Sequence, residues 1–161
     1  MKTARLFLSA VLLLGFAACA KNESIPAPAV TKPPKHEHQP PHGGTPVVLG
    51  KENFHLELVR DAAAGTLTAY VLDRHMAGIV RLEAPTIELQ ATAGGVRQTL
   101  VLNAVPNPLS SETVGDTSVF TGQADWLKNT PEFAGVFPEI SVRGLKFEQV
   151  AFQFPAGNDQ D

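Results

Sequence analysis

The stretch FHLELVRDAAAGTLTAYVLD, residues 54–73, decides the fold of this chain. Apolar and polar side chains alternate on both sides of a short loop rich in alanine and glycine. A period of two residues is typical of β-strands, whose successive side chains point to opposite faces. We therefore predict strands over 53–60 and 66–73, joined through residues 61–65 as an antiparallel hairpin.

The same strand-like pattern continues through the rest of the chain. From Thr45 to Pro155, short apolar runs recur roughly every 8 to 15 residues and are separated by Gly, Pro, Asn and Asp. This pattern predicts an all-β fold, a single antiparallel β-sandwich of Ig-like or Greek-key type, over residues 45–156. The other strands are predicted at 46–49, 78–82, 85–92, 96–105, 117–124, 138–143 and 146–154.

One short helical excursion is expected near residues 125–135. Asp125 can cap a first turn, and Thr130 followed by Pro131 has the pattern that opens a helix. Residues 157–161 are predicted to form a disordered tail, since chain ends fray unless they are tied down.

The amino terminus resembles the signal of a bacterial lipoprotein. Lys2 and Arg5 form a basic start, and residues 6–18 are an almost unbroken apolar run that ends at Cys19, the one cysteine of the chain. A run of about 13 residues suits a signal peptide and is short for a membrane span. The resemblance implies a signal peptide over 1–18 and lipidation of Cys19. The alternative is an ordinary signal peptide with an incidental cysteine.

Residues 19–44 are predicted to be a lipidated, disordered linker rich in Pro and His. Six prolines and few apolar side chains between 20 and 41 leave little surface to bury, so the cost of ordering the segment would not be offset. The lipoprotein resemblance implies a place in the bacterial cell envelope, attached through the lipid and favouring the outer membrane. The net charge is −3 and no basic run is present, so nucleic acid is not an expected partner.

The alternation on the predicted hairpin separates an apolar stripe from a polar face. His55 and Glu57 fall on the face opposite the apolar stripe. A loop centred on Ala63 would put His55 opposite Val71, with Tyr70 and Leu72 turned toward the core. A shift of one residue in this register would scatter the polar set.

Metal-binding side chains gather at one end of this hairpin. Asp73 and His75 follow the second strand, and the Gly43-Gly44 pair would let His42 swing in toward them. Imidazole and carboxylate groups suit zinc, copper or nickel. The alternative is that these side chains only keep a surface hydrophilic. The candidate metal ligands are His42, His55, Glu57, Asp73 and His75, with His36 and His38 of the linker as weaker candidates from a His-rich tract.

The segment from His42 to Gln90 resembles the amino-terminal HGG segment of periplasmic adaptor proteins of heavy-metal efflux pumps. The shared pattern is His-Gly-Gly, a short strand, HLELV and GTLTAYVLD. The whole domain is also similar to small bacterial lipoproteins without an assigned function, including ETVGDTSVFTGQADWL and FEQVAFQFP. The chain lacks the long coiled-coil hairpin of an adaptor. The resemblance implies metal handling through His42, Gly43, Gly44, His55 and Glu57.

Enzyme motifs are missing from the sequence. It contains no Gly-x-Ser-x-Gly, no phosphate-binding glycine loop before a helix and no convincing acid–base pair of carboxylates. We therefore predict a protein without catalytic activity, an envelope lipoprotein that captures or buffers transition-metal ions or assists metal resistance. The first alternative is a non-catalytic β-sandwich lipoprotein that binds a protein or cell-envelope partner, in which the histidines are incidental. The second alternative is a small metal-dependent enzyme, which a metal site with an open position would allow.

Overall fold

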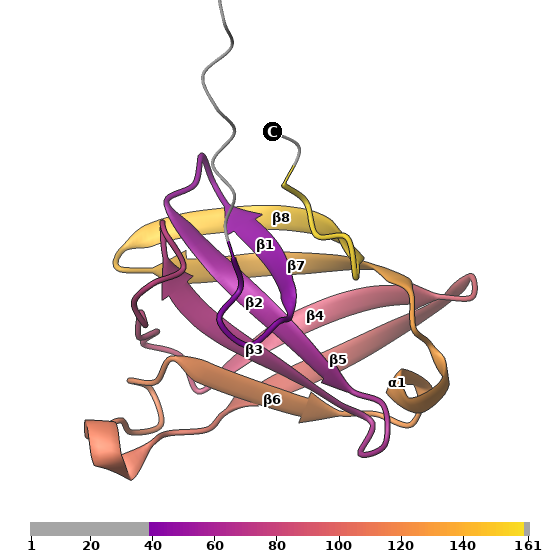
Figure 1. Cartoon of the computed structure of the whole chain (residues 1–161), viewed down its shortest axis with the longest axis horizontal. Helices are drawn as coiled ribbons and strands as arrows, with labels where there is room; N and C mark the ends of the chain where they lie inside the picture. The colour runs from indigo at the N-terminus through magenta and orange to yellow at the C-terminus, as the bar shows by residue number, and fades with distance from the viewer. Residues whose placement is uncertain (1–38, 160–161) are drawn as a thin grey trace, which may run out of the picture. The chain divides into compact units, whose positions relative to one another are not determined.

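The computed structural model of the chain describes residues 39–159. This part is almost entirely β-structure (Figure 1). A 3₁₀ turn, η1 (Pro108–Ser110), and one short helix, α1 (Trp126–Asn129), interrupt the strands. The strands are β1 (Thr45–Leu49), β2 (Phe54–Asp61), β3 (Thr66–Asp73), β4 (Thr86–Ala93), β5 (Val96–Ala104), β6 (Val119–Gln123), β7 (Phe133–Val142) and β8 (Leu145–Phe154).

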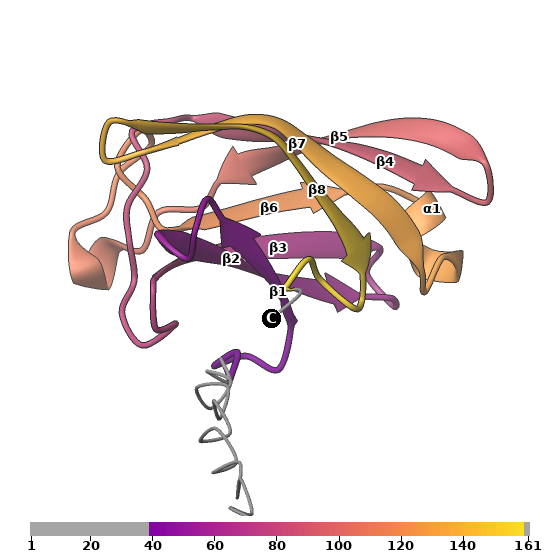
Figure 2. The ribbon, with the colours of Figure 1, turned by 90° about the horizontal axis from the view of Figure 1, so that it is seen from above.

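All eight strands belong to one antiparallel sheet with the order β1-β2-β3-β6-β5-β4-β7-β8. Strands β4, β5 and β6 are sequential neighbours and β7 returns beside β4, which is a Greek-key arrangement. The sheet folds over, so that β1, β2 and β3 lie below β4, β5 and β7 in Figure 2, and β1 meets β8 to nearly close it. The predicted all-β fold with antiparallel layers is confirmed, with both layers continuous through one sheet.

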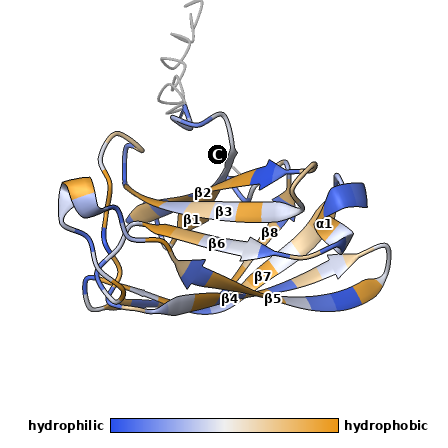
Figure 3. Ribbon diagram, turned by 90° about the horizontal axis from the view of Figure 1, so that it is seen from below, coloured by the Kyte–Doolittle hydropathy of each residue, from blue (hydrophilic) through white to orange (hydrophobic). Residues whose placement is uncertain are grey.

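A single apolar core fills the space between the two layers. Hydrophobic and hydrophilic segments alternate along the strands (Figure 3). The inward positions of the central hairpin are fully buried and comprise Leu56, Leu58, Leu67, Ala69 and Val71. Because alternate residues point to opposite faces, the outward positions of the same hairpin, which include Glu57 and Tyr70, share the other face.

The register of the β2–β3 hairpin differs by one residue from the prediction. His55 lies opposite Leu72 rather than Val71, and Glu57 lies opposite Tyr70. Asp61 accounts for the shift, because it still pairs with Thr66 and its Oδ1 accepts hydrogen bonds from the backbone N–H groups of Ala63 and Ala64, at 2.8 and 3.0 Å, which gives a four-residue turn over 62–65 instead of the predicted five-residue loop. The prediction that Tyr70 points toward the core was therefore wrong, since it shares the outer face with Glu57.

One local strand prediction was also wrong. Residues 78–82 form no strand and make only isolated bridges, Ile79 to Leu72 and Leu82 to Thr117. The short helical excursion expected near 125–135 is confirmed by α1, which ends at Asn129 before β7 begins at Phe133. The Phe133 ring is buried and stacks on Phe154 with centroids 4.9 Å apart, so core packing outweighs the helix-opening pattern before it.

Residues after β8 close the seam between β1 and β8. The Asn158 side chain accepts a hydrogen bond from the Val48 N–H at 2.7 Å and donates one to the Val48 carbonyl at 3.2 Å. Gly157 approaches Pro46 so closely that a Cβ would lie 2.2 Å from the Pro46 carbonyl oxygen. The predicted disordered tail is therefore wrong for Gly157 and Asn158, which belong to the domain.

The predicted signal peptide, the lipidated Cys19 and the linker histidines His36 and His38 lie outside the described residues. The linker was expected to extend to residue 44, but His42 and Gly44 are hydrogen-bonded to β2. Within residues 39–159, no helix is long and apolar enough to cross a membrane.

Candidate metal centre at the His42–Glu57 pair

Glu57 lies in the middle of β2 with its side chain on the outer face of the sheet. Its cross-strand neighbours are Pro46 of β1 and Tyr70 of β3. The residue is nevertheless 0% exposed, because the segment His42–Gly44 is bonded directly to its carboxylate. His55, two residues earlier on the same face, is also 0% exposed. The alternative of a simple hydrophilic exposed face therefore does not describe these two residues.

Both oxygens of the Glu57 carboxylate are hydrogen-bonded. Oε1 accepts from the backbone N–H of His42 at 2.7 Å and of Gly44 at 2.9 Å. Oε2 lies 2.7 Å from Nδ1 of His42. A buried carboxylate is costly unless it is paired and hydrogen-bonded, and these contacts compensate its burial. Glu57 therefore fixes both the backbone and the ring of the incoming segment.

The glycines of the HGG motif permit this approach. A Cβ on Gly44 would lie 2.6 Å from the Leu58 carbonyl oxygen and under 3.0 Å from side-chain atoms of Val59 and Glu57. Gly43 has a φ of +69°, in the left-handed region, which turns the chain between His42 and Gly44. The first glycine is therefore required for direction and the second for contact.

The His42 ring is held on a second side by Tyr70. The two rings stack with centroids 3.8 Å apart and an interplanar angle of 10°. The His42 side chain remains 42% exposed. An ionised carboxylate can only accept, so Nδ1–H donates to Glu57, and in the neutral ring this leaves the lone pair on Nε2. Metal-binding histidines are commonly oriented by a carboxylate in this way.

The other predicted ligands do not join this pair. His55 Nδ1 lies 3.3 Å from the backbone carbonyl oxygen of Asp73. Asp73 closes the following turn, because its Oδ1 accepts from the N–H groups of His75 and Ala77, each at 3.0 Å. His75 is exposed. In residues 39–159 no group of three or more His, Cys, Asp or Glu side chains is placed to hold a metal ion.

The turn contacts also act on the charge state of Asp73. Burial by itself raises the pKa of this carboxyl. The backbone hydrogen bonds from Ala77, His75 and Gly78 outweigh that effect and hold the pKa below its usual value. Asp73 is thus a charged acceptor occupied by its own turn.

A second buried carboxylate, Glu112, was not singled out from the sequence. It accepts from the Asn107 N–H at 3.1 Å, the Thr117 hydroxyl at 2.9 Å and the Ser118 hydroxyl at 2.7 Å. Nε of Arg81 lies 3.9 Å from Oε1 of the Glu112 carboxylate. Glu112 sits in a loop without periodicity, so strand patterns could not identify it, and its contacts show a role in ordering residues 107–118.

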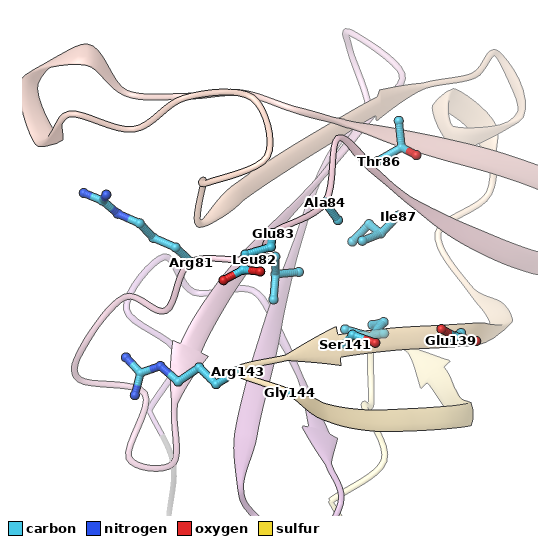
Figure 4. Close-up of a pocket in the computed structure, with 11 residues that line it drawn as sticks. Arg81, Leu82, Glu83, Ala84, Thr86, Ile87, Glu139, Ser141, Arg143 and Gly144 are labelled. Carbon is cyan, nitrogen blue, oxygen red and sulfur yellow. The ribbon is translucent and has the colours of Figure 1, made fainter.

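A cavity of about 470 Å³ opens where β4 and β7 separate (Figure 4). The two strands pair only between residues 90–92 and 134–136. Beyond this point Ile87 and Ile140, both buried, contribute apolar lining. The side chains of Arg81 and Arg143 extend away from Ile87 and Ser141, so the guanidinium groups do not converge in the hollow (Figure 4).

The His42–Glu57 pair is thus the arrangement in which a motif from the sequence coincides with a preformed geometry. Comparison of the chain with protein-family models, with curated proteins and with solved structures finds no match.

Proposed function

We propose that this protein is a lipid-anchored protein of the bacterial cell envelope that binds a transition-metal ion, with His42 as the fixed ligand. The observation that carries the proposal is the 2.7 Å contact between His42 Nδ1 and the fully buried Glu57 carboxylate, in a ring that stays 42% exposed. The expected role is capture or buffering of the ion, or assistance in metal resistance.

The chemistry of the donors favours copper, zinc or nickel. These ions accept imidazole nitrogen and do not require thiolate, and Cys19, the one cysteine, is assigned to the lipid. One imidazole alone binds weakly, so further ligands are needed. His36 and His38 precede His42 by six and four residues and are the proposed additional donors.

Glu57 has a supporting role in this proposal and does not bind the ion itself, because both of its oxygens already accept hydrogen bonds. Asp73 is occupied by its turn and His55 is buried, so neither is proposed as a ligand. His75 is exposed and remains a candidate from the domain.

Membrane attachment forms a separate part of the proposal. Lipidation of Cys19 would place the domain at a membrane, and a proline-rich linker over residues 20–41 could hold it up to about 70 Å away, at about 3.1 Å per residue. Metabolic labelling with a radioactive fatty acid tests this, since label is expected in the wild type and absent in Cys19→Ser. Label in both proteins would contradict the assignment.

Calorimetric titration of the soluble chain from residue 20 with Cu(II), Zn(II) and Ni(II) tests metal binding. We expect saturable binding well below about 1 mM and a clear loss of affinity in His42→Ala. His36→Ala/His38→Ala tests the linker donors and His75→Ala the exposed histidine. Binding weaker than about 1 mM for all three ions, or no effect of His42→Ala, would contradict the proposed function.

A second candidate function is binding of a protein or cell-envelope partner. The cavity beside β4 and β7 favours it, since its volume of about 470 Å³ lies in the range of ligand pockets and buried apolar residues contribute to its lining. Substitution of Thr86 and Ser141, which line the cavity at exposed positions, would then impair partner capture without altering metal titration. His42→Ala would have the reverse pattern if metal binding is the function.

A further inference from the structure

We infer that Glu57 is the positioning residue of the metal site, and that it decides which nitrogen of His42 can bind the ion. This inference rests on the proposed function and specifies how the same site sets the tautomer of its histidine ligand. Glu57 holds His42 in the tautomer with a proton on Nδ1, so that Nε2 carries the lone pair for the metal. If Nδ1 accepted the hydrogen bond instead, the proton of the neutral ring would lie on Nε2, and this nitrogen would have no lone pair for the metal.

The first support is that the two oxygens of the Glu57 carboxylate have different hydrogen-bond partners. Oε1 is occupied by the backbone N–H groups of His42 and Gly44, which can only donate. These two donors fill the acceptor positions of Oε1. A charged carboxylate has no proton to give, so Oε2 must accept from Nδ1 of His42, 2.7 Å away.

The second support is the restriction of the ring. Tyr70 lies directly opposite Glu57 in the β2–β3 register, so one cross-strand pair supplies both contacts to His42. The stack at 3.8 Å fixes the plane of the ring and the hydrogen bond fixes its rotation within that plane. A ligand held before the ion arrives loses little freedom on binding.

The third support is the close packing of the segment His42–Gly44 against β2. Gly44 has no room for a Cβ, because the nearest atom is the backbone oxygen of Leu58 at 2.6 Å, which cannot move aside as a side chain could. The backbone of His42 and Gly44 is therefore placed by β2 itself. The ring orientation is a property of the folded domain and requires no contact with the linker before residue 39.

Glu57→Gln is the informative substitution because glutamine has almost the same shape but a different polarity. Its carbonyl oxygen can accept from the two backbone N–H groups, and its NH₂ group then faces Nδ1 of His42. An NH₂ group donates, so Nδ1 must accept and the ring proton moves to Nε2. The nitrogen that should bind the metal is then protonated in the neutral ring.

The test uses ¹⁵N NMR of the histidine rings in the soluble chain from residue 20, first without metal. For neutral His42 we expect a protonated Nδ1 and an unprotonated Nε2 in the wild type, and the opposite pattern in Glu57→Gln. The wild-type measurement needs no variant, so it remains decisive if Glu57→Gln fails to fold. A wild-type ring protonated on Nε2 would overturn the inference.

Zinc titration of the same samples supplies the second readout. We expect Glu57→Gln to bind Zn(II) about 10- to 100-fold more weakly with unchanged stoichiometry, the usual cost of losing a hydrogen-bonding partner of a ligand histidine. Glu88→Gln is the matched control, because it makes the same substitution at an exposed position of β4 and should alter neither tautomer nor affinity. Equal affinity of wild type and Glu57→Gln would overturn the inference. Absence of zinc binding by the wild type would instead remove the proposed function, while the NMR pattern still decides the role of Glu57.

Discussion

His42 and Glu57 are separated by 15 residues in the chain, yet Nδ1 of the first lies 2.7 Å from Oε2 of the second. The contact joins the end of the proline-rich segment to the centre of the sheet. Because Glu57 also accepts from the backbone of His42 and Gly44, a single side chain determines where the domain begins.

Glu57→Ala should destabilise the domain more than Glu57→Gln. Alanine leaves the N–H groups of His42 and Gly44 without their acceptor, and the loss of buried hydrogen-bond partners costs about 1–3 kcal/mol. Glutamine keeps an acceptor for both groups. Urea unfolding followed by circular dichroism measures the difference, and equal midpoints for the two variants would show that the backbone contacts contribute little.

Gly44→Ala should lower stability through steric contact. The added Cβ would meet the Leu58 carbonyl oxygen at 2.6 Å, so the segment must move away from β2, at a typical overpacking cost of about 1–3 kcal/mol. Gly43→Ala is the comparison, because nothing lies within 4 Å of its Cβ position and only its positive φ is strained. We expect the His42 ring resonances to shift more in Gly44→Ala, and the opposite order would contradict the packing argument.

Glu112 should make stability depend on pH in the acid range. Burial raises its pKa, but the hydrogen bonds from Ser118, Asn107 and Thr117 outweigh burial and hold the folded-state pKa below the ordinary value of 4.5. The unfolded state therefore takes up the proton first as pH falls, so the stabilisation is complete above about pH 4.5 and is lost as pH falls toward the folded-state pKa.

Glu112→Gln removes this ionisation and supplies the measurement. The free energy of unfolding of the wild type should exceed that of the variant by a constant amount near neutral pH. The difference should shrink below about pH 4.5. A difference that grows as the pH falls would show that the sign assigned to the Glu112 pKa is wrong.

Asn158→Ala should weaken the seam between β1 and β8. The variant loses the hydrogen bonds to the Val48 N–H and carbonyl, each of which is worth about 0.5–1.5 kcal/mol. Faster amide hydrogen exchange at Val48 is the local signature. Asn103→Ala, at an exposed position of β5, is the control, and identical exchange at Val48 in both variants would refute a closing role for Asn158.

Much of the fold could be predicted because alternation and turn residues are local signals. The strand predicted over 66–73 coincides with β3, and most others differ by one or two residues, but β7 begins five residues before the strand predicted at 138–143. The hairpin register could not be fixed in this way, since it depends on how the Asp61 side chain binds the turn. The ordered place of Asn158 depends on Val48, which lies 110 residues away in the sequence.

The candidate site was predictable in part. The HGG motif and the strand position of Glu57 placed both residues among five candidate ligands, and the freedom of the glycines suggested that His42 folds back. The burial of Glu57 could not be predicted, because alternation alone assigns it to an outer face without showing what covers that face. The stack on Tyr70 was missed because the register placed Tyr70 on the wrong side.

The most direct measurement of the central claim is ¹⁵N NMR of the histidine rings while Zn(II) is added to the soluble chain from residue 20. The account predicts that Nε2 of His42 acquires the chemical shift of a metal-bound nitrogen. Nδ1 should stay protonated, with its N–H still donating to Glu57. Unchanged His42 resonances at saturating zinc would contradict it.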